Sequence, residues 1–195
     1  KIIKAAELKK DDVVLEVGPG IGTLTQELAK NADKVITVEK DKAMIEILKE
    51  TLKDFNNVEV VPGDILKLQT KSYNLKANYK VVANIPYYLT SPLIRLFLEA
   101  NPPAGGQPQE IILLMQKEVA QRIVAPPPKM SLLAVSVQFY AKAEIVSYVS
   151  KNSFWPIPKV DSAIIKITPK KSGAKINSDL FFKVVKAGFS HPRKQ

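Results

Sequence analysis

Short apolar runs alternate with amphipathic segments along the first two thirds of the chain. The runs are rich in valine and isoleucine, which is typical of strands buried on both faces of a parallel sheet. They are Val13–Val17, Lys34–Glu39, Val58–Val61, Tyr79–Ala83 and Ile111–Met115. Apolar residues recur at helical spacing over Leu24–Lys30, Asp41–Leu52, Ser91–Glu99 and Gln116–Ile123. This alternation predicts βαβ units, and therefore a mostly parallel sheet with helices on both faces.

The pattern changes after Ala125. The segment Leu132–Tyr140 is predicted as a helix, although its valines also allow a strand. Two strand-like segments, Ala143–Val149 and Ala163–Thr168, predict an antiparallel hairpin at the sheet edge, and Leu180–Phe189 predicts a short helix. We therefore expect an α/β fold with a seven-stranded sheet that is parallel except for this last hairpin.

Composition excludes several classes of protein. Of the 195 residues, 46% are hydrophobic and 25% are charged, as in ordinary globular proteins, and no apolar run is long enough to span a membrane. The chain has no cysteine and a single histidine, His191, which excludes disulfide scaffolds, cysteine nucleophiles and histidine metal clusters. The first twelve residues read as a helix and a turn, without the apolar core of a signal peptide. We expect no metal, no membrane and a cytoplasmic protein.

The chain is basic. It has 29 Lys and Arg against 19 Asp and Glu, a formal charge of +10. This balance favours a polyanionic partner, nucleic acid before membrane surface, although a basic globular protein without such a partner would show it too. Basic residues that could contact phosphates are Lys117, Arg122, Lys129, Lys159, Arg193 and Lys194.

Chemically distinctive residues follow four of the predicted strands. They are Gly18, Glu39, Asp64 and Asn84. In open α/β sheets, ligands bind beyond the carboxyl ends of the strands. Four such residues in corresponding positions predict a binding site at this edge of the sheet.

A glycine loop follows the first strand and opens a helix. Gly18, Gly20 and Gly22 have the spacing G-x-G-x-G, whereas dinucleotide folds have G-x-G-x-x-G and this chain has Thr23 at the last position. The loop therefore suits a nucleoside without a pyrophosphate, and a tight strand-to-helix turn is the alternative reading.

Two carboxylates complete a pocket for an adenosine moiety. Glu39 lies 21 residues beyond Gly18, where an acid can accept hydrogen bonds from both ribose hydroxyls. Asp64 can accept from an adenine amino group while Ile65 packs against the ring. The alternatives are an exposed carboxylate at Glu39 and a turn or helix cap at Asp64. Because the loop lacks the glycine spacing that binds a pyrophosphate, the pocket points to S-adenosylmethionine as cofactor.

The sharpest signal is Asn84-Ile85-Pro86-Tyr87 at the end of the fourth strand. The exocyclic amine of adenine is a poor nucleophile because its lone pair is delocalised into the ring. The Asn84 side-chain oxygen and a backbone carbonyl, for which Ile85 is the candidate, could accept both amine hydrogens and direct the lone pair at an electrophilic methyl. Pro86 stiffens the turn, and Tyr87 offers a ring for stacking the target base. The alternative is a proline turn with a core tyrosine.

A second aromatic face lies in Phe154-Trp155-Pro156-Ile157-Pro158. Phe154 could sandwich a base against Tyr87, since aromatic stacking is worth about 1–3 kcal/mol per base. A hydrophobic hairpin turn is the alternative.

These residues resemble a known family, the adenine-N6 dimethyltransferases that act on small-subunit ribosomal RNA. The matching stretches are VVLEVGPGIGTLT (13–25), VEKD (38–41), PGDIL (62–66), ANIPYYLTSPLI (83–94), MQKEVAQRI (115–123), FWPIPKVDSAI (154–164) and FFKVVKAGFSHPRK (181–194). The resemblance implies a Rossmann-like methyltransferase that transfers two methyls to each of two adjacent adenines near the 3′ end of this RNA, in ribosome biogenesis. It implies cofactor contacts at Gly18, Glu39, Asp64 and Asn84, with base stacking at Tyr87 and Phe154.

Three features depart from the family. An N-terminal Gln-Asn-Phe-Leu element is absent, the segment 126–133 lacks the usual glycine-rich loop, and the chain stops at Gln195 where the family continues into a helical domain. We expect residues 1–170 to form the catalytic domain of a monomer and 171–195 to be a linker and the start of a helical RNA-binding region. The rival functions are a large-subunit resistance methyltransferase and a non-catalytic RNA-binding relative. An oxidoreductase that uses NAD fits least.

Overall fold

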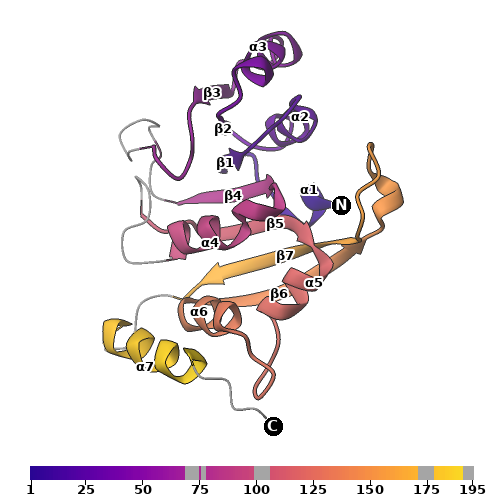
Figure 1. The fold of residues 1–195 in the computed structure, drawn as a ribbon. Helices are drawn as coiled ribbons and strands as arrows, with labels where there is room; N and C mark the ends of the chain where they lie inside the picture. The colour runs from indigo at the N-terminus through magenta and orange to yellow at the C-terminus, as the bar shows by residue number, and fades with distance from the viewer. Residues whose placement is uncertain (69–74, 76–77, 99–105, 171–177, 191–195) are drawn as a thin grey trace.

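A computed structural model describes residues 1–68, 75, 78–98, 106–170 and 178–190 (Figure 1). Its centre is one seven-stranded sheet with the order β3-β2-β1-β4-β5-β7-β6. The strands are β1 (Val13–Val17), β2 (Lys34–Glu39), β3 (Val58–Pro62), β4 (Tyr79–Asn84), β5 (Glu110–Gln116), β6 (Ala141–Val149) and β7 (Ser162–Pro169). The predicted strands are thereby confirmed.

The first five strands pair in parallel, and β7 pairs antiparallel with both β5 and β6. The predicted sheet, mostly parallel with an edge hairpin, is confirmed. Within the hairpin, β7 is antiparallel to the first five strands, whereas β6 runs in the same direction as they do. The parallel order places the carboxyl ends of β1, β2, β3 and β4 along one edge.

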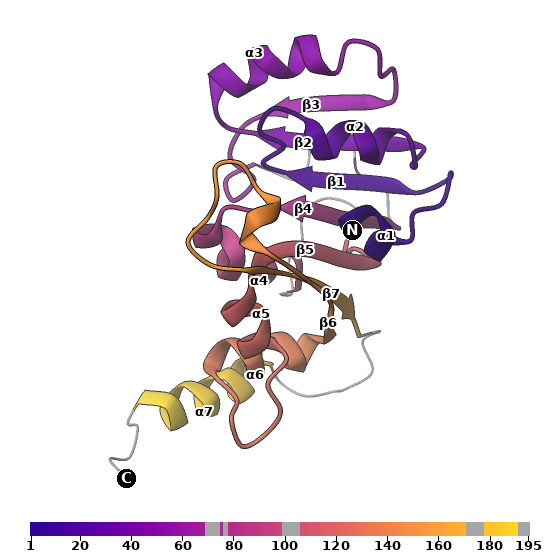
Figure 2. The ribbon, with the colours of Figure 1, turned by 90° about the vertical axis from the view of Figure 1, so that its right-hand side faces the viewer.

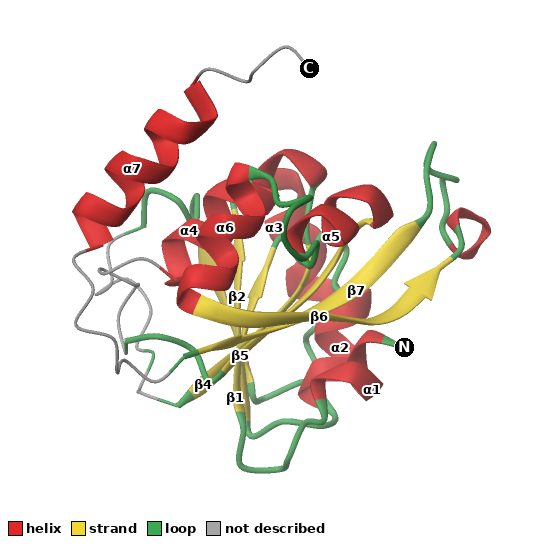
Figure 3. Ribbon diagram, turned by 90° about the horizontal axis from the view of Figure 1, so that it is seen from below, coloured by secondary structure: helices red, strands yellow, loops and turns green. Residues whose placement is uncertain are grey.

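Helices cover both faces of the sheet (Figure 3). They are α1 (Ile2–Ala6), α2 (Thr23–Ala29), α3 (Lys42–Thr51), α4 (Thr90–Leu98), α5 (Lys117–Ile123), α6 (Leu132–Tyr140) and α7 (Ser178–Ser190), with short 3₁₀ helices η2 (Tyr87–Leu89) and η3 (Lys151–Ser153). Asp41, the first residue of the segment predicted as a helix, is the N-cap of α3, because its carboxylate accepts from the Ala43 N–H at 2.8 Å.

The structure shows which secondary structure forms α6 and where α1 ends. The segment Leu132–Tyr140 is a helix and not a strand, and Ser131 caps it by accepting from the Ala134 N–H at 3.2 Å. At the N-terminus, the predicted helix and turn are present, and α1 ends where Glu7 adopts a left-handed conformation with φ 44°.

Two apolar cores lie on opposite faces of the sheet. One gathers Leu15, Val17 and Val81 with buried residues of α4, α5 and α6. The other gathers Val14, Val35 and Val82 with buried residues of α1 and α2. The sheet between them is therefore buried on both faces, which explains the nearly continuous apolar strands.

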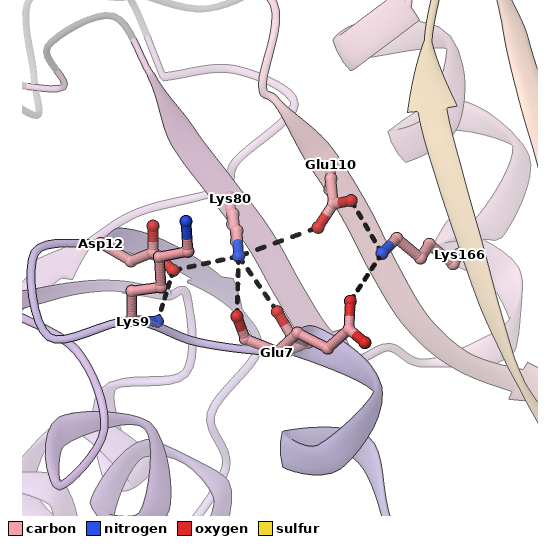
Figure 4. A network of polar contacts seen from close by, with 7 residues as sticks. Glu7, Lys9, Asp12, Lys80, Glu110 and Lys166 are labelled. Atoms are coloured by element: carbon pink, nitrogen blue, oxygen red, sulfur yellow. Dashed lines mark hydrogen bonds and ion pairs between the residues drawn. The ribbon is translucent and has the colours of Figure 1, made fainter.

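A network of ion pairs closes the amino ends of the strands (Figure 4). Lys80 is buried, and its ammonium lies 3.0 Å from the Asp12 carboxylate and donates to the carbonyls of Ala6 and Glu7 at 3.2 Å. Glu110 pairs with Lys166 at 2.8 Å, and this hydrogen bond raises the pKa of Lys166. Lys80 thus joins the end of α1 to the sheet, at the edge opposite the strand ends described below.

The helix α7 packs on α6 through aromatic rings. The rings of Phe139 and Phe181 are stacked with centroids 4.2 Å apart, and Phe182 lies 5.7 Å from Tyr140. Figure 1 shows α7 outside the layered sheet and helices, beside α6.

Candidate active site

The glycine loop turns sharply between β1 and α2. The Gly18 N–H donates to the Val38 carbonyl at 3.0 Å, which ties the loop to β2. Gly22 begins α2 as its N-cap with φ +88°, and a Cβ there would lie 3.0 Å from Leu48 Cδ2. Only glycine combines this left-handed conformation with such close packing against α3. The loop is therefore held open at the strand ends, with its backbone facing the space beyond β1 and β2.

Glu39 ends β2 as a buried carboxylate, 8% exposed. One oxygen accepts from the N–H groups of Lys40 and Asp41 at 2.8 and 2.9 Å, and the other lies 3.4 Å from the Gly20 nitrogen. No lysine or arginine among the described residues pairs with it. The alternative of an exposed surface carboxylate is therefore wrong, and the carboxylate keeps capacity for further hydrogen-bond donors.

Asp64 follows β3 beside Glu39. The Gly63 N–H donates to the Glu39 carbonyl at 2.8 Å, which brings the two segments together. One Asp64 oxygen accepts from the Leu66 N–H at 3.0 Å, so part of the turn-forming role considered for this residue is real. Ile65 is buried, 3% exposed.

These residues share one cavity of about 190 Å³, which we call the first cleft. It is lined by Val17, Gly18, Gly20, Val38, Glu39, Lys40, Gly63, Asp64, Ile65, Pro86, Tyr88 and Leu89. The structure therefore brings together all the residues predicted to bind an adenosine moiety except Asn84.

Asn84 lies instead in a neighbouring cavity of about 340 Å³, which we call the second cleft. It is lined by Gly18, Asn84, Ile85, Pro86, Leu114, Phe154, Trp155, Pro156, Pro158 and Ser162. The Asn84 side chain is exposed and makes no hydrogen bond with the described residues, whereas the Ile85 side chain is buried in the core at 2% exposed. Ile85 can therefore offer the cleft its backbone and little of its side chain.

Gly18 and Pro86 line both clefts. A Cβ on Gly18 would lie 3.8 Å from Pro86 Cδ, so the glycine loop and the turn after β4 are in close approach. The two clefts therefore adjoin, with the carboxylates on one side of the junction and Asn84 on the other.

Tyr87 begins η2, where the Leu89 N–H donates to the Pro86 carbonyl at 2.9 Å. The Tyr87 side chain lies outside the part of the chain that the structure describes, as do Arg193 and Lys194. The next residue, Tyr88, is 67% exposed, and the Lys40 ammonium lies 5.8 Å from the centre of its ring. Sequence reasoning missed Lys40 and Tyr88 as cleft residues, although both stand inside the quoted motifs.

Phe154 stands in the wall of the second cleft. It is half-buried and packs against the core on the α1 and α2 face. Leu114 and Ser162 are cleft residues that the sequence did not single out. The signal for Leu114 is strand register, since it pairs with Asn84 across β4 and β5.

Glu16 lies beneath the glycine loop, 1% exposed, and accepts from the Thr25 hydroxyl at 2.6 Å. Burial raises the pKa of this carboxyl to about 7, against the lowering effect of the Thr25 hydrogen bond. The nearby charge of Glu39 raises it further. The sequence analysis did not identify Glu16, although a carboxylate inside an otherwise apolar strand is a recognisable feature.

No helix in the described part of the chain is long and apolar enough to cross a membrane. Within the same residues, no group of three or more histidine, aspartate or glutamate side chains could hold a metal ion.

The geometry suits two ligands that meet at Gly18 and Pro86. Acceptor carboxylates and open glycine backbone in the first cleft fit the hydroxyl and amino donors of a nucleoside. The amide of Asn84, with apolar and aromatic walls around it, fits the edge and face of a flat heterocycle in the second cleft. The arrangement can therefore hold two groups for transfer at the junction.

Comparison with known proteins agrees with this geometry. A family model described as ribosomal RNA adenine dimethylase matches residues 1–195. The chain is 44% identical over 197 residues to "Ribosomal RNA small subunit methyltransferase A" of Dehalococcoides mccartyi, covering all of this chain and 66% of that protein. It therefore spans just under two thirds of the length of this curated relative.

Two solved structures are similar. A dimethyladenosine transferase from Plasmodium falciparum matches with TM-score 0.83 and 37% identity, over 100% of this chain and 69% of the other. The 23S rRNA methyltransferase ErmE matches with TM-score 0.77 and 31% identity, over 93% and 70%. By the whole-chain match to the family model and these identities, the chain belongs to the ribosomal RNA adenine dimethylase family.

Proposed function

We propose that this chain is the catalytic part of an S-adenosylmethionine-dependent enzyme that dimethylates N6 of adenines in small-subunit ribosomal RNA. The observation that carries the proposal is the junction of the two clefts at Gly18 and Pro86. It sets a nucleoside pocket with carboxylates directly beside a base pocket with a free amide, as transfer between two ligands requires.

The first cleft is the proposed cofactor site. The Glu39 carboxylate, fixed by backbone N–H groups, accepts the ribose hydroxyls, and Gly18 and Gly20 leave room for close approach of the ligand. A Cβ at Gly20 would meet nothing within 4 Å, so the loop is open on this side. The free Asp64 oxygen accepts the adenine amino group, and Ile65 packs beside the ring. S-adenosylmethionine, when bound, supplies a methyl group activated by the sulfonium.

The second cleft is the proposed target site. The Asn84 side-chain oxygen and the Ile85 carbonyl accept the two hydrogens of the target amine, which directs the nitrogen lone pair toward the junction. Pro86 holds the turn, and Tyr87 and Phe154 stack on the target base. Alignment of the amine supplies most of the catalysis. No side chain has to remove a proton before the transfer, because the nitrogen attacks through its lone pair, and the excess proton on the methylated nitrogen then passes to solvent. We also propose that Asn84 touches the cofactor.

The relatives favour the small-subunit substrate. The chain is 44% identical to a protein named for small-subunit rRNA but 31% identical to one named for 23S rRNA. The rival of a non-catalytic RNA-binding module fits less well, because a pure binder has no need for the exposed Asn84 amide at the junction. We further propose that residues 1–170 are the catalytic domain of a cytoplasmic monomer and that 171–195 lead into a helical RNA-binding region.

Calorimetric titration with S-adenosylmethionine is the first test. We expect the unaltered chain to bind and Glu39→Ala to bind at least tenfold more weakly, because the variant lacks the charged acceptor of two ribose hydrogen bonds. Glu46→Ala is the matched control, since Glu46 lies on the exposed face of α3 and pairs only with Lys49 there. Equal binding by both variants would place the cofactor elsewhere.

The substrate is tested separately with unmodified ribosomal subunits and labelled cofactor. We expect label in small-subunit RNA and none in large-subunit RNA. The reverse result would assign the chain to the resistance type. Binding of RNA by a chain that binds no cofactor would support the non-catalytic module instead.

A further inference from the structure

Trp155 is the only tryptophan of the chain and is 93% exposed. No other large apolar side chain among the described residues is as exposed. Single exposed apolar side chains are ordinary on protein surfaces, but this one lines a cleft, and clusters of exposed apolar side chains mark contact sites. Its neighbour Ile157 is also exposed, at 57%.

The loop that carries Trp155 is braced at its base. The Lys151 N–H donates to the Asp161 carboxylate at 3.0 Å, and the Lys117 N–H donates to the Asp161 carbonyl at 3.1 Å. The Ser153 and Phe154 N–H groups close the turn of η3 at 3.0 and 3.2 Å. A braced loop with prolines presents the indole with little loss of conformational entropy on binding.

The same loop reaches the proposed target site. Figure 2 shows it, in orange, crossing in front of the carboxyl ends of the neighbouring strands. Trp155 lines the second cleft together with Asn84 and Phe154. The charged side chains of this loop are the exposed Lys151 and Lys159 and one carboxylate, Asp161. The loop therefore carries a net positive charge, which suits a polyanion.

We propose that Trp155 stacks on an unpaired base next to the target adenine in the RNA strand. The inference rests on the proposed function and extends it from the target base to the base beside it. Phe154 points into the cleft wall and serves the target, while Trp155 stands at the rim, where the strand enters or leaves. Exposed aromatic rings between basic side chains are the usual platform for single-stranded RNA.

The single tryptophan makes the proposal directly measurable. The chain is titrated with a short single-stranded RNA that has two adjacent adenines, and intrinsic tryptophan fluorescence is recorded. We expect saturable quenching, because a stacked base quenches the indole. An RNA with an abasic site beside the adenines should still bind, by the anisotropy of a labelled strand, but should not quench.

Variants test the energetic contribution. Trp155→Ala should bind this RNA roughly 5- to 100-fold more weakly, and Trp155→Phe should retain most of the affinity, as stacking predicts. Both should bind S-adenosylmethionine and unfold thermally like the unaltered chain, since the indole supports no core. Ile47→Ala is the matched control, because Ile47 is an exposed apolar residue of α3, 38% exposed and outside both clefts.

The outcomes separate this inference from the proposed function. If the chain methylates RNA but its fluorescence and the affinity of Trp155→Ala do not change, the stacking role is wrong and the methyltransferase stands. If fluorescence responds to intact small subunits but never to RNA alone, Trp155 contacts a ribosomal protein, and the proposal is overturned. If RNA neither binds nor is methylated, the proposed function and this inference fail together.

Discussion

Asn84 is positioned by its backbone and not by contacts of its side chain. It ends a strand whose other five residues are buried, and it pairs in register with Leu114 of β5. The amide is therefore held at a defined place while both of its polar atoms remain available. This is the arrangement expected of a residue that serves a substrate, because a side chain used for structure would already be hydrogen-bonded.

Asn84→Ala should lower kcat roughly 100-fold, the scale of one lost hydrogen-bonding group aligned with the reacting atoms. We expect cofactor affinity to fall much less, because Asn84 lines the second cleft and would reach the cofactor only across the junction at Gly18 and Pro86. Single-turnover methylation with cofactor titration checks both. A variant that loses cofactor binding but keeps its turnover at saturation would contradict the proposed role.

The buried carboxyl of Glu16, beneath the glycine loop, makes the stability of the folded chain depend on pH. Its carboxyl has a pKa of about 7 in the folded chain and about 4.5 when unfolded. Between these values the folded chain holds a proton that the unfolded chain has released, so stability decreases as pH rises from 4.5 to 7 and is level above. The loss amounts to roughly 3 kcal/mol at 1.36 kcal/mol per pKa unit.

Glu16→Gln should remove this dependence, because an amide keeps the Thr25 hydrogen bond and cannot ionise. Urea unfolding at several pH values between 4.5 and 8 measures it. Glu50→Gln, on the exposed surface of α3, is the control and should follow the unaltered chain. A variant curve with an undiminished pH dependence would mean that another group titrates.

At the scale of elements, the order of strands and helices follows from local patterns. Asp41 was recognisable as a helix cap from its position alone, and the glycine loop from its spacing. The end of the first helix was not predicted. The first helix stops at Glu7, where the buried Lys80, far along the chain, takes up the carbonyls of Ala6 and Glu7.

Gly22 tests the packing of α2 against α3. Gly22→Ala introduces a left-handed alanine whose Cβ would lie 3.0 Å from Leu48 and 3.1 Å from Thr51. We expect a loss of about 2–4 kcal/mol from conformational strain and overpacking together. Gly106→Ala is the matched control, because Gly106 has a similar φ of +85° and a Cβ there would meet no atom of the described residues within 4 Å. This variant should lose only the strain. If both variants lost the same free energy of unfolding in urea, the close packing at Gly22 would make no contribution of its own.

In the molecule as a whole, the carboxyl ends and the amino ends of the strands have different roles. The carboxyl edge carries the clefts, and the amino edge carries the ion pairs of Lys80, Glu110 and Lys166 (Figure 4). Polar groups that stabilise the sheet are thus separated from polar groups left available for ligands. The site can keep unpaired acceptors because the fold does not depend on pairing them.

Lys80→Met should destabilise the chain by about 3–5 kcal/mol, since it leaves Asp12 and two helix carbonyls without their buried cation. Lys34→Met is the control, because the Lys34–Glu59 pair is well exposed, with side chains 39% and 41% accessible, and such pairs contribute less than about 1 kcal/mol. Thermal unfolding of both variants decides. Cofactor affinity should be unchanged, as the network lies at the opposite edge.

Local sequence patterns predicted the alternation of strands and helices, the glycine loop and the strand-end positions of Gly18, Glu39, Asp64 and Asn84. Each of these depends on residues close together in the chain, whose periodicity and turn chemistry can be read locally. For parallel strands, that placement also implies a shared edge.

Which side chains share a cavity depends on the three-dimensional packing of the chain. Asn84 meets Phe154 across seventy residues because β5 alone separates β4 from β7, and the loop that carries Phe154 enters β7 beside the end of β5. The burial of Glu16, the exposure of Trp155 and the cation between α1 and the sheet likewise depend on segments remote in sequence. Local pattern cannot specify these, because burial and strand register are properties of the whole packed molecule.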